Sequence, residues 1–86
     1  MPEVSRFFGI RIMFFFNDHT PPHFHAIYGE LKAVFDIQTL QMTEGALPPR
    51  ARGFIVEWAA QHQDELMADW NTVRAGQTPA KIAPLE

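Results

Sequence analysis

The chain of 86 residues contains no cysteine and a single serine, Ser5. The absence of cysteine excludes disulfides, thiolate nucleophiles, iron–sulfur clusters and cysteine-based zinc sites. Any metal site must therefore use histidine, carboxylates and water. The single serine argues against a serine hydrolase, and the sequence contains neither a phosphate-binding glycine loop nor a dinucleotide-binding fingerprint.

The sequence also lacks a strong charge of either sign. Seven Lys and Arg stand against ten Asp and Glu, for a net charge of −3. No global basic field therefore attracts nucleic acid or an anionic membrane. The apolar stretch over residues 7–16 is interrupted by Arg11, is followed by no small-residue cleavage site and is too short to span a bilayer. We expect a cytoplasmic protein that does not insert into a membrane.

The length and composition predict a single domain over residues 1–86. The chain is 47% apolar and has eight Phe, which can build a compact core. Folding of so short a chain removes only about 60% of its unfolded surface from water. Stability should therefore be modest, and formation of a homodimer would increase it.

The first half of the chain predicts a small antiparallel sheet of three to four strands, over about residues 6–44. Apolar residues alternate in the first of these strands, which is typical of a half-buried strand. Gly29-Glu30 has the length and the leading glycine of a type II′ hairpin turn. The strands are expected at residues 8–16, 23–28, 31–37 and 39–43.

The second half predicts one long helix over about residues 48–75, followed by an extended tail over 77–86. Pro48 suits the start of a helix and Gly76 suits its end. Apolar side chains recur between them at helical spacing: Ala51, Phe54, Ile55, Trp58, Ala59, Leu66, Trp70 and Val73. This stripe must pack on the sheet, so the expected fold is α+β with the helix on one face.

Three of the four histidines lie within seven residues, at positions 19, 23 and 25. On a strand, His23 and His25 point to the same face. With Gly29-Glu30 as the turn, the register places Asp36 opposite His23 on that face. Two histidines and one carboxylate with open coordination positions suit a divalent transition metal, namely Zn, Mn, Fe or Ni. The predicted metal ligands are His23, His25 and Asp36.

Asp18 and His19 approach the same face from the adjoining loop, which leaves alternatives open. The carboxylate of Asp18 can replace that of Asp36 in a metal site. Without a metal, His19 and His23 would act as general base and general acid. In a purely structural interpretation, His23 pairs with Asp36 across the strands and Asp18 caps the turn.

His62 lies in the apolar stripe of the predicted helix. A lone histidine on an apolar face is usually a buried, hydrogen-bonded structural residue. In the predicted register, the helix packs on the face opposite His23 and His25, so His62 should share no ligand with them. A register shifted by one residue would reverse this expectation. The catalytic candidates are therefore Asp18, His19, His23 and His62.

The first predicted strand suggests two kinds of partner. Met13 and Phe15 fall on its less buried face, where they would form an apolar patch for a protein. Arg6 and Arg11 lie on or beside this strand, and basic residues interleaved with aromatics can stack RNA bases. The RNA interpretation fails if these arginines are buried or paired with acidic residues.

The histidine segment resembles the signature of a small bacterial family of unknown function, number four-one-six-zero. The motif covers residues 17–29 and includes Asp18-His19-x-Pro21-Pro22-His23-Phe24-His25. Further similar segments lie at residues 32–37, 44–48 and 58–70, so the resemblance covers about residues 5–85. Glu30 departs from the pattern, because many members have a second glycine there. A polar residue in this turn should make little difference.

The resemblance implies a stand-alone bacterial protein without an established activity. Members are often encoded beside a second small uncharacterised domain, which implies a protein partner from a neighbouring gene in a toxin–antitoxin-like arrangement. The family's pattern also includes Asp18, His19, His23, His25 and His62. It assigns no role to any of them.

The residues and the resemblance lead to two hypotheses about function. The first is a binding or regulatory module, one half of a toxin–antitoxin-like pair, that acts through the histidine segment. The alternative is a metal-dependent or histidine-based nuclease or hydrolase, whose residues would be His19, His23 and His25 with Asp18 or Asp36. Turnover by the purified protein would favour the enzyme, whereas co-purification with a co-expressed neighbour would favour the module.

Overall fold

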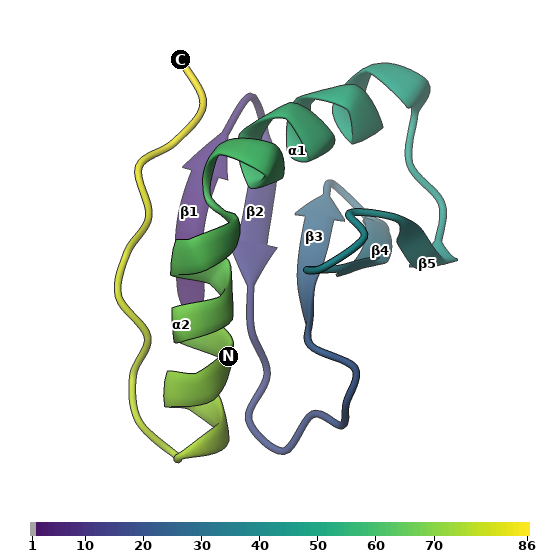
Figure 1. Cartoon of the computed structure of the whole chain (residues 1–86). Helices are drawn as coiled ribbons and strands as arrows, with labels where there is room; N and C mark the ends of the chain where they lie inside the picture. Colours follow the sequence, from purple (N-terminus) through teal and green to yellow (C-terminus); the bar gives the residue numbers. More distant parts are fainter. Residues whose placement is uncertain (1) are drawn as a thin grey trace.

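The structure is a computed structural model that describes residues 2–86. Its elements are β1 (Glu3–Phe7), β2 (Ile10–Met13), β3 (His23–Tyr28), β4 (Leu31–Asp36), β5 (Met42–Gly45), α1 (Pro49–Gln61) and α2 (Gln63–Arg74). The strands form one antiparallel sheet in the order β1-β2-β3-β4-β5, and the helices follow it in the chain (Figure 1). The α+β class is therefore confirmed, but the sheet has five strands instead of three to four.

The additional strand is β1, which lies before the first predicted strand and is joined to β2 by a tight turn. Phe8 and Gly9 connect β1 to β2, and their φ angles are 50° and 79°. Two successive positive φ angles are the geometry of a type I′ hairpin turn. The strand predicted over residues 8–16 is β2, but its bounds are wrong, because residues 8 and 9 form the turn and the strand ends at Met13. The turn was missed because a Phe stands where Asn or Asp usually signals it.

The β3–β4 hairpin has the predicted register. His23 pairs with Asp36, and Gly29 in the turn has a positive φ of 61°. Phe24 and Phe35 face each other on the core side of this hairpin, with ring centroids 5.4 Å apart. The register therefore leaves His23 on the other face of the sheet.

The prediction of one long helix is wrong, because the chain breaks at His62, where φ is −132° and ψ is 24°. A straight helix over residues 48–75 would be about 42 Å long. The largest extent of the molecule is 33 Å. With the break, α1 crosses one end of the sheet and α2 turns to run alongside it (Figure 1). Neither helix within residues 2–86 combines the length and apolar character needed to cross a bilayer.

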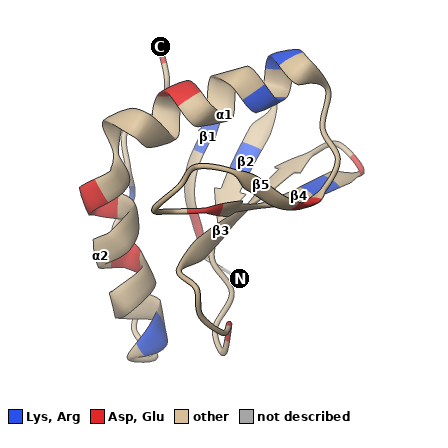
Figure 2. Ribbon diagram, turned by 45° about the vertical axis from the view of Figure 1, so that its right-hand side comes forward, with Lys and Arg blue, Asp and Glu red and all other residues tan. Residues whose placement is uncertain are grey.

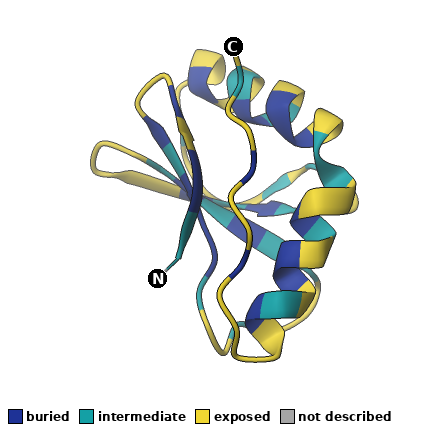
Figure 3. Ribbon diagram, turned by 90° about the vertical axis from the view of Figure 1, so that its left-hand side faces the viewer, coloured by how far each residue is buried: buried dark blue, intermediate teal, exposed yellow. Residues whose placement is uncertain are grey.

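The core lies between the sheet and the two helices, which both occupy the same side of the sheet (Figure 3). Trp58 is fully buried, and its ring centroid lies 5.3 Å from that of Phe7 and 6.1 Å from that of Phe24. Its indole N–H donates to the carbonyl oxygen of Ala83 at 2.8 Å. The predicted apolar stripe is buried at Ala51, Ile55, Trp58, Ala59, Leu66, Trp70 and Val73, and Phe54 is partly buried.

The tail over residues 77–86 is extended, as predicted, and lies along β1 of its own chain (Figure 1). The N–H of Ile82 donates to the carbonyl oxygen of Val4 at 2.8 Å. Asp69 of α2 accepts the N–H of Ala80 at 3.0 Å. Burial raises the pKa of Asp69, with a smaller opposing effect from the Ala80 hydrogen bond. The tail is thus held to both the sheet and α2.

The strand surface predicted to bind partners differs from expectation. Met13 is buried and Phe15 is half-buried, so they do not form an exposed patch. Arg6 and Arg11 both pair with the carboxylate of Glu3, at 2.9 Å and 2.8 Å. Hydrogen bonds from Arg6 and then Arg11 lower the pKa of Glu3 to about 2. Both arginines therefore pair with an acidic residue. This is the condition under which the RNA interpretation fails.

Candidate functional site

Asp18, His23 and His25 converge at the end of the sheet where β3 begins. Strand alternation places both imidazoles on one face, and the loop over residues 14–22 brings Asp18 beside them. Oδ2 of Asp18 lies 3.1 Å from Nε2 of His23 and 2.9 Å from Nε2 of His25. One ligand atom from each of these three side chains lies within 4.8 Å of the other two. Among residues 2–86, this is the cluster of His, Asp and Glu that could hold a metal ion.

The hydrogen bonds of His23 specify where its protons are. Its Nδ1 lies 2.8 Å from the carbonyl oxygen of Pro21, which can only accept a hydrogen bond, so Nδ1 carries the hydrogen. In a neutral imidazole, Nε2 would then present only a lone pair to the carboxylate of Asp18. Two acceptors 3.1 Å apart repel each other unless a proton or a metal cation lies between them. A proton or a metal cation between Nε2 of His23 and Oδ2 of Asp18 would satisfy both atoms.

Two aromatic rings hold the imidazoles in place. The ring of Phe15 lies 3.9 Å from that of His25, and the ring of Trp70 lies 5.1 Å from that of His23, between centroids. The two histidine side chains keep 18% and 15% of their surface exposed, so solvent still reaches them. The sequence predicted that Trp70 is buried, but it gave no signal that α2 reaches His23.

A hollow of about 510 Å³ opens beside the three residues. The loop before β3 supplies one wall, and β4 and β5 supply the other through Val34, Asp36, Thr43 and Glu44. The lining described for this hollow contains carboxylates and imidazoles but no Lys or Arg. The pairing of Glu44 with Val34 explains why β5 contributes, and no pattern in the sequence assigned Glu44 to the site.

Asp36 lies on the wall of the hollow and outside the cluster. Its Oδ1 accepts the backbone N–H of Gln38 at 2.7 Å and that of Thr39 at 2.9 Å. The carboxylate therefore caps the turn that follows β4. The carboxylate that contacts the two histidines belongs to Asp18.

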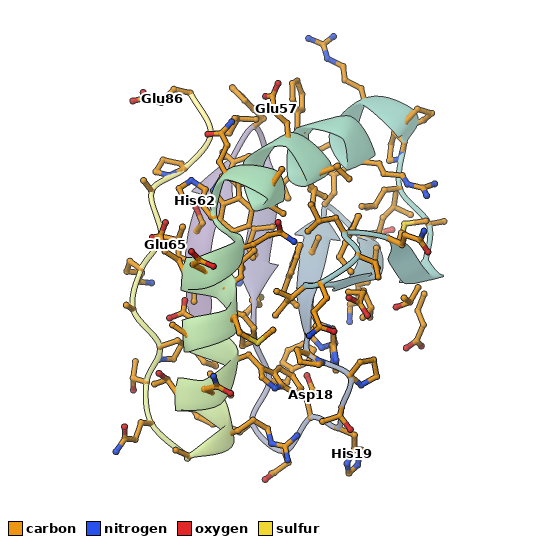
Figure 4. The ribbon with its side chains drawn as sticks, in the orientation of Figure 1. Asp18, His19, Glu57, His62, Glu65 and Glu86 are labelled. Carbon is orange, nitrogen blue, oxygen red and sulfur yellow. The ribbon has the colours of Figure 1, made fainter. Side chains whose placement is uncertain are left out.

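The other two histidines occupy different places. His19 lines the hollow, so it lies close to the cluster without belonging to it. His62 lies at the junction of α1 and α2, well away from Asp18 and His19 (Figure 4). Its Nδ1 donates to Oε1 of Glu65 at 2.6 Å, and its ring packs on Trp58 at 5.4 Å between centroids. These contacts are those of a structural histidine.

Comparison with protein-family models finds a match over most of the chain. The model described as Domain of unknown function (DUF4160) matches residues 9–71, which is well over half of the chain. The comparison with curated proteins and that with solved structures each find no match. The matched range includes the whole Asp18–His25 cluster and both walls of the hollow.

Proposed function

We propose that this chain, which belongs to the DUF4160 family of domains of unknown function, is a metal-dependent hydrolase with Asp18, His23 and His25 as its metal ligands. One observation carries the proposal. His23 gives its Nδ1 hydrogen to the carbonyl oxygen of Pro21 and turns Nε2 toward a carboxylate. Metal-binding histidines typically donate their other ring N–H to a carbonyl or carboxylate in this way.

The distances support a metal between these groups. Zinc binds histidine nitrogen and carboxylate oxygen at about 2.1 Å, so two neighbouring ligands of one ion lie about 3.0–3.4 Å apart. The two N–O distances to Asp18 are 3.1 Å and 2.9 Å. Small movements of the side chains would therefore complete a site with three protein ligands. Water or substrate would take the remaining positions from the hollow.

The surroundings suit hydrolysis. A divalent metal lowers the pKa of bound water and polarises a carbonyl group. The rings of Phe15 and Trp70 restrict water around the imidazoles, which strengthens electrostatic interactions there. His19 on the wall of the hollow is placed to transfer a proton to a leaving group.

The charge of the hollow favours an ester or amide substrate over a nucleic acid. Asp36 and Glu44 face the site from the wall opposite the cluster. A phosphodiester would meet these carboxylates without any Lys or Arg from the described lining to neutralise it. Enzymes that act on phosphates normally supply such cations. We therefore favour the general hydrolase over the nuclease.

Metal binding by matched variants tests the site. Untagged protein freed of metal would be titrated with Co(II), Zn(II) and Mn(II), and the bound metal measured by elemental analysis and by the Co(II) absorption spectrum. We expect one equivalent per chain for the wild type. Asp18→Asn and His25→Ala should weaken binding at least about a hundredfold, while Asp36→Asn, which preserves an oxygen for the turn, should bind normally.

The possible outcomes separate the alternatives. Loss of binding in Asp36→Asn but not in Asp18→Asn would assign the carboxylate ligand to Asp36. Absence of metal uptake by the folded wild type would contradict the metal site. The contact between His23 and Asp18 would then be a hydrogen bond, which favours histidine-based acid–base chemistry. Hydrolysis of chromogenic esters and amides by the metal-loaded protein, absent in Asp18→Asn, tests the reaction itself.

A further inference from the structure

We infer that the opposite end of the sheet carries a second binding surface, and that it binds an acidic segment of another protein through an apolar anchor. This surface, here named the aromatic groove, has a volume of about 450 Å³. The β1–β2 turn, the end of β3 and the start of α1 form it. Its lining residues are Phe8, Tyr28, Pro48, Arg50, Ala51 and Phe54.

Three of the four exposed large apolar side chains of residues 2–86 lie at this end, and the fourth is Phe16 in the loop at the other end. Phe8 is 54% exposed, Tyr28 is 37% exposed and Leu31, which pairs with Tyr28 across the β3–β4 turn, is 43% exposed. The ring centroid of Phe8 lies 4.8 Å from that of Phe54 on α1, so strands and helix form one continuous apolar surface. Contiguous patches of this kind mark interaction sites more often than isolated exposed residues do.

The identity of residue 8 is not explained by folding. Phe8 has a φ of 50°, a left-handed conformation that is unfavourable for most residues but that Asn tolerates. The chain itself buries less than half of this side chain. An Asn would therefore serve the turn better. A partner that covers Phe8 would supply the burial that its own chain does not.

The charges beside the aromatic groove favour an acidic partner. The guanidinium carbon of Arg50 lies 5.5 Å from the ring centroid of Phe54, and Arg52 follows on the same helix. Neither arginine forms an ion pair with another residue in the range 2–86. Both lie in the first turns of α1, whereas Glu57 lies about two turns further along (Figure 2). Among residues 2–86, Arg50 is the one charged residue in the lining of the groove, whereas Glu30 lies in the neighbouring β3–β4 turn.

The same charges disfavour a second copy of this chain as the occupant. A two-fold dimer brings the same surface of both subunits together. Arg50 of one copy would then meet Arg50 of the other, and such a like-charge contact across an interface is unfavourable. A segment with Leu or an aromatic residue next to Asp or Glu would instead fill the groove and pair with the arginines.

Peptide selection provides the test. The full chain would be used to select random 12-residue peptides displayed on phage, and the enriched peptides would be synthesised and their Kd measured by fluorescence anisotropy. We expect an apolar anchor flanked by acidic residues, with binding that weakens as salt rises. Phe8→Asn should weaken binding about tenfold or more, and so should Arg50→Glu combined with Arg52→Glu.

The controls make the test independent of folding and of the metal site. Phe8→Asn should fold at least as well as the wild type and bind metal normally, because Asn suits the positive φ. Phe16→Asn changes a Phe that is 42% exposed in the loop at the other end of the sheet, so peptide affinity should not change. Enrichment of basic peptides, no enrichment at all, or affinities that Phe8→Asn leaves unchanged would overturn the inference. A concentration-dependent dimer that Phe8→Asn dissociates would also overturn it, because the occupant would then be a second copy.

Discussion

The two ends of β3 differ in whether their side chains find partners within the chain. At one end, the polar groups of His23 and His25 have partners within the chain, in Asp18 and the carbonyl oxygen of Pro21. At the other end, Tyr28 is exposed in the aromatic groove, which no side chain of residues 2–86 fills. One end is therefore organised around a charge, whereas the other presents surface that gains from being covered.

This difference indicates that one short strand can contribute to two independent surfaces. Six residues of strand extend over about 17–20 Å, which is beyond the range at which substitutions usually interact. Changes at the Asp18–His25 cluster should therefore leave the aromatic groove unaffected, and the reverse should hold. The helices that pack on the sheet are the support that both ends share.

Removal of Trp58 should damage both ends and have the largest effect. Its ring is fully buried against Phe7 and Phe24, and its N–H holds Ala83. Trp58→Ala should lower the free energy of unfolding by about 3–5 kcal/mol, measured by urea denaturation. Trp58→Phe keeps an aromatic ring and loses the hydrogen bond, so its loss should be clearly smaller. Equal losses in the two variants would contradict this account.

Gly45→Ala should have the next largest effect and act mainly on the wall of the hollow. A Cβ at Gly45 would overlap the carbonyl oxygen of Lys32, and the φ of Gly45 is 87°. We expect a loss of about 2–3 kcal/mol in the free energy of unfolding, because β5 must move away from β4. That movement displaces Thr43 and Glu44, while Phe8 and Tyr28 lie on hairpins that do not include β5.

Gly29→Ala provides the matched control. Gly29 also has a positive φ, of 61°, but a Cβ there meets nothing within 4 Å. Its loss should come from backbone strain alone and be about 1 kcal/mol. Nuclear magnetic resonance shifts should change along β5 in Gly45→Ala and only around the turn in Gly29→Ala. The same loss in both variants would show that β4 and β5 can separate without cost.

Glu3→Gln should have the smallest effect and touch neither end. Pairing with Arg6 and Arg11 lowers the pKa of Glu3 from 4.5 to about 2. A carboxylate with a lowered pKa stabilises the fold above its unfolded pKa, and that contribution disappears as the pH falls from about 4.5 to about 2. Because Arg6 is largely exposed, we expect a difference below about 1 kcal/mol at pH 7.

The measurement is the difference in urea midpoint between wild type and Glu3→Gln at pH 7 and at pH 2.5. The contribution of Asp69 to stability depends on pH in the opposite direction. Burial raises the pKa of Asp69, so its ionisation destabilises the fold as the pH rises. Both proteins contain Asp69, so its contribution cancels in the difference. A difference that grows toward low pH would contradict the ion pairs.

Much of the sheet could be predicted because its signals are local. Gly29-Glu30 has the right length for a two-residue turn, and the alternation on both sides then leads to the pairing of His23 with Asp36. The turn at Phe8 could not be predicted in this way, because its left-handed φ lies at a residue that rarely adopts it. The break at His62 was also hidden, since buried residues continue at helical spacing on both sides of it.

The candidate site was predictable in part for the same reason. Strand alternation places His23 and His25 on one face regardless of the rest of the fold. The carboxylate that meets them depends on how the loop before β3 returns, and spacing along the chain does not specify this. Asp36 was the carboxylate predicted from the register, but its oxygen is used by the turn that it caps.

The sequence by itself determined the properties that depend on composition and on neighbouring residues. These are the absence of cysteine chemistry, the α+β class, the β3–β4 hairpin and the shared face of His23 and His25. The tertiary structure alone decided the contact of Trp70 with His23, the choice of Asp18 over Asp36 and the meeting of Phe8 with Phe54. The physical reason is the range of the interactions. Hydrogen-bonded turns and strand alternation act over a few residues, whereas the contacts of Trp70 and Phe54 join distant segments that only packing of the helices on the sheet brings together.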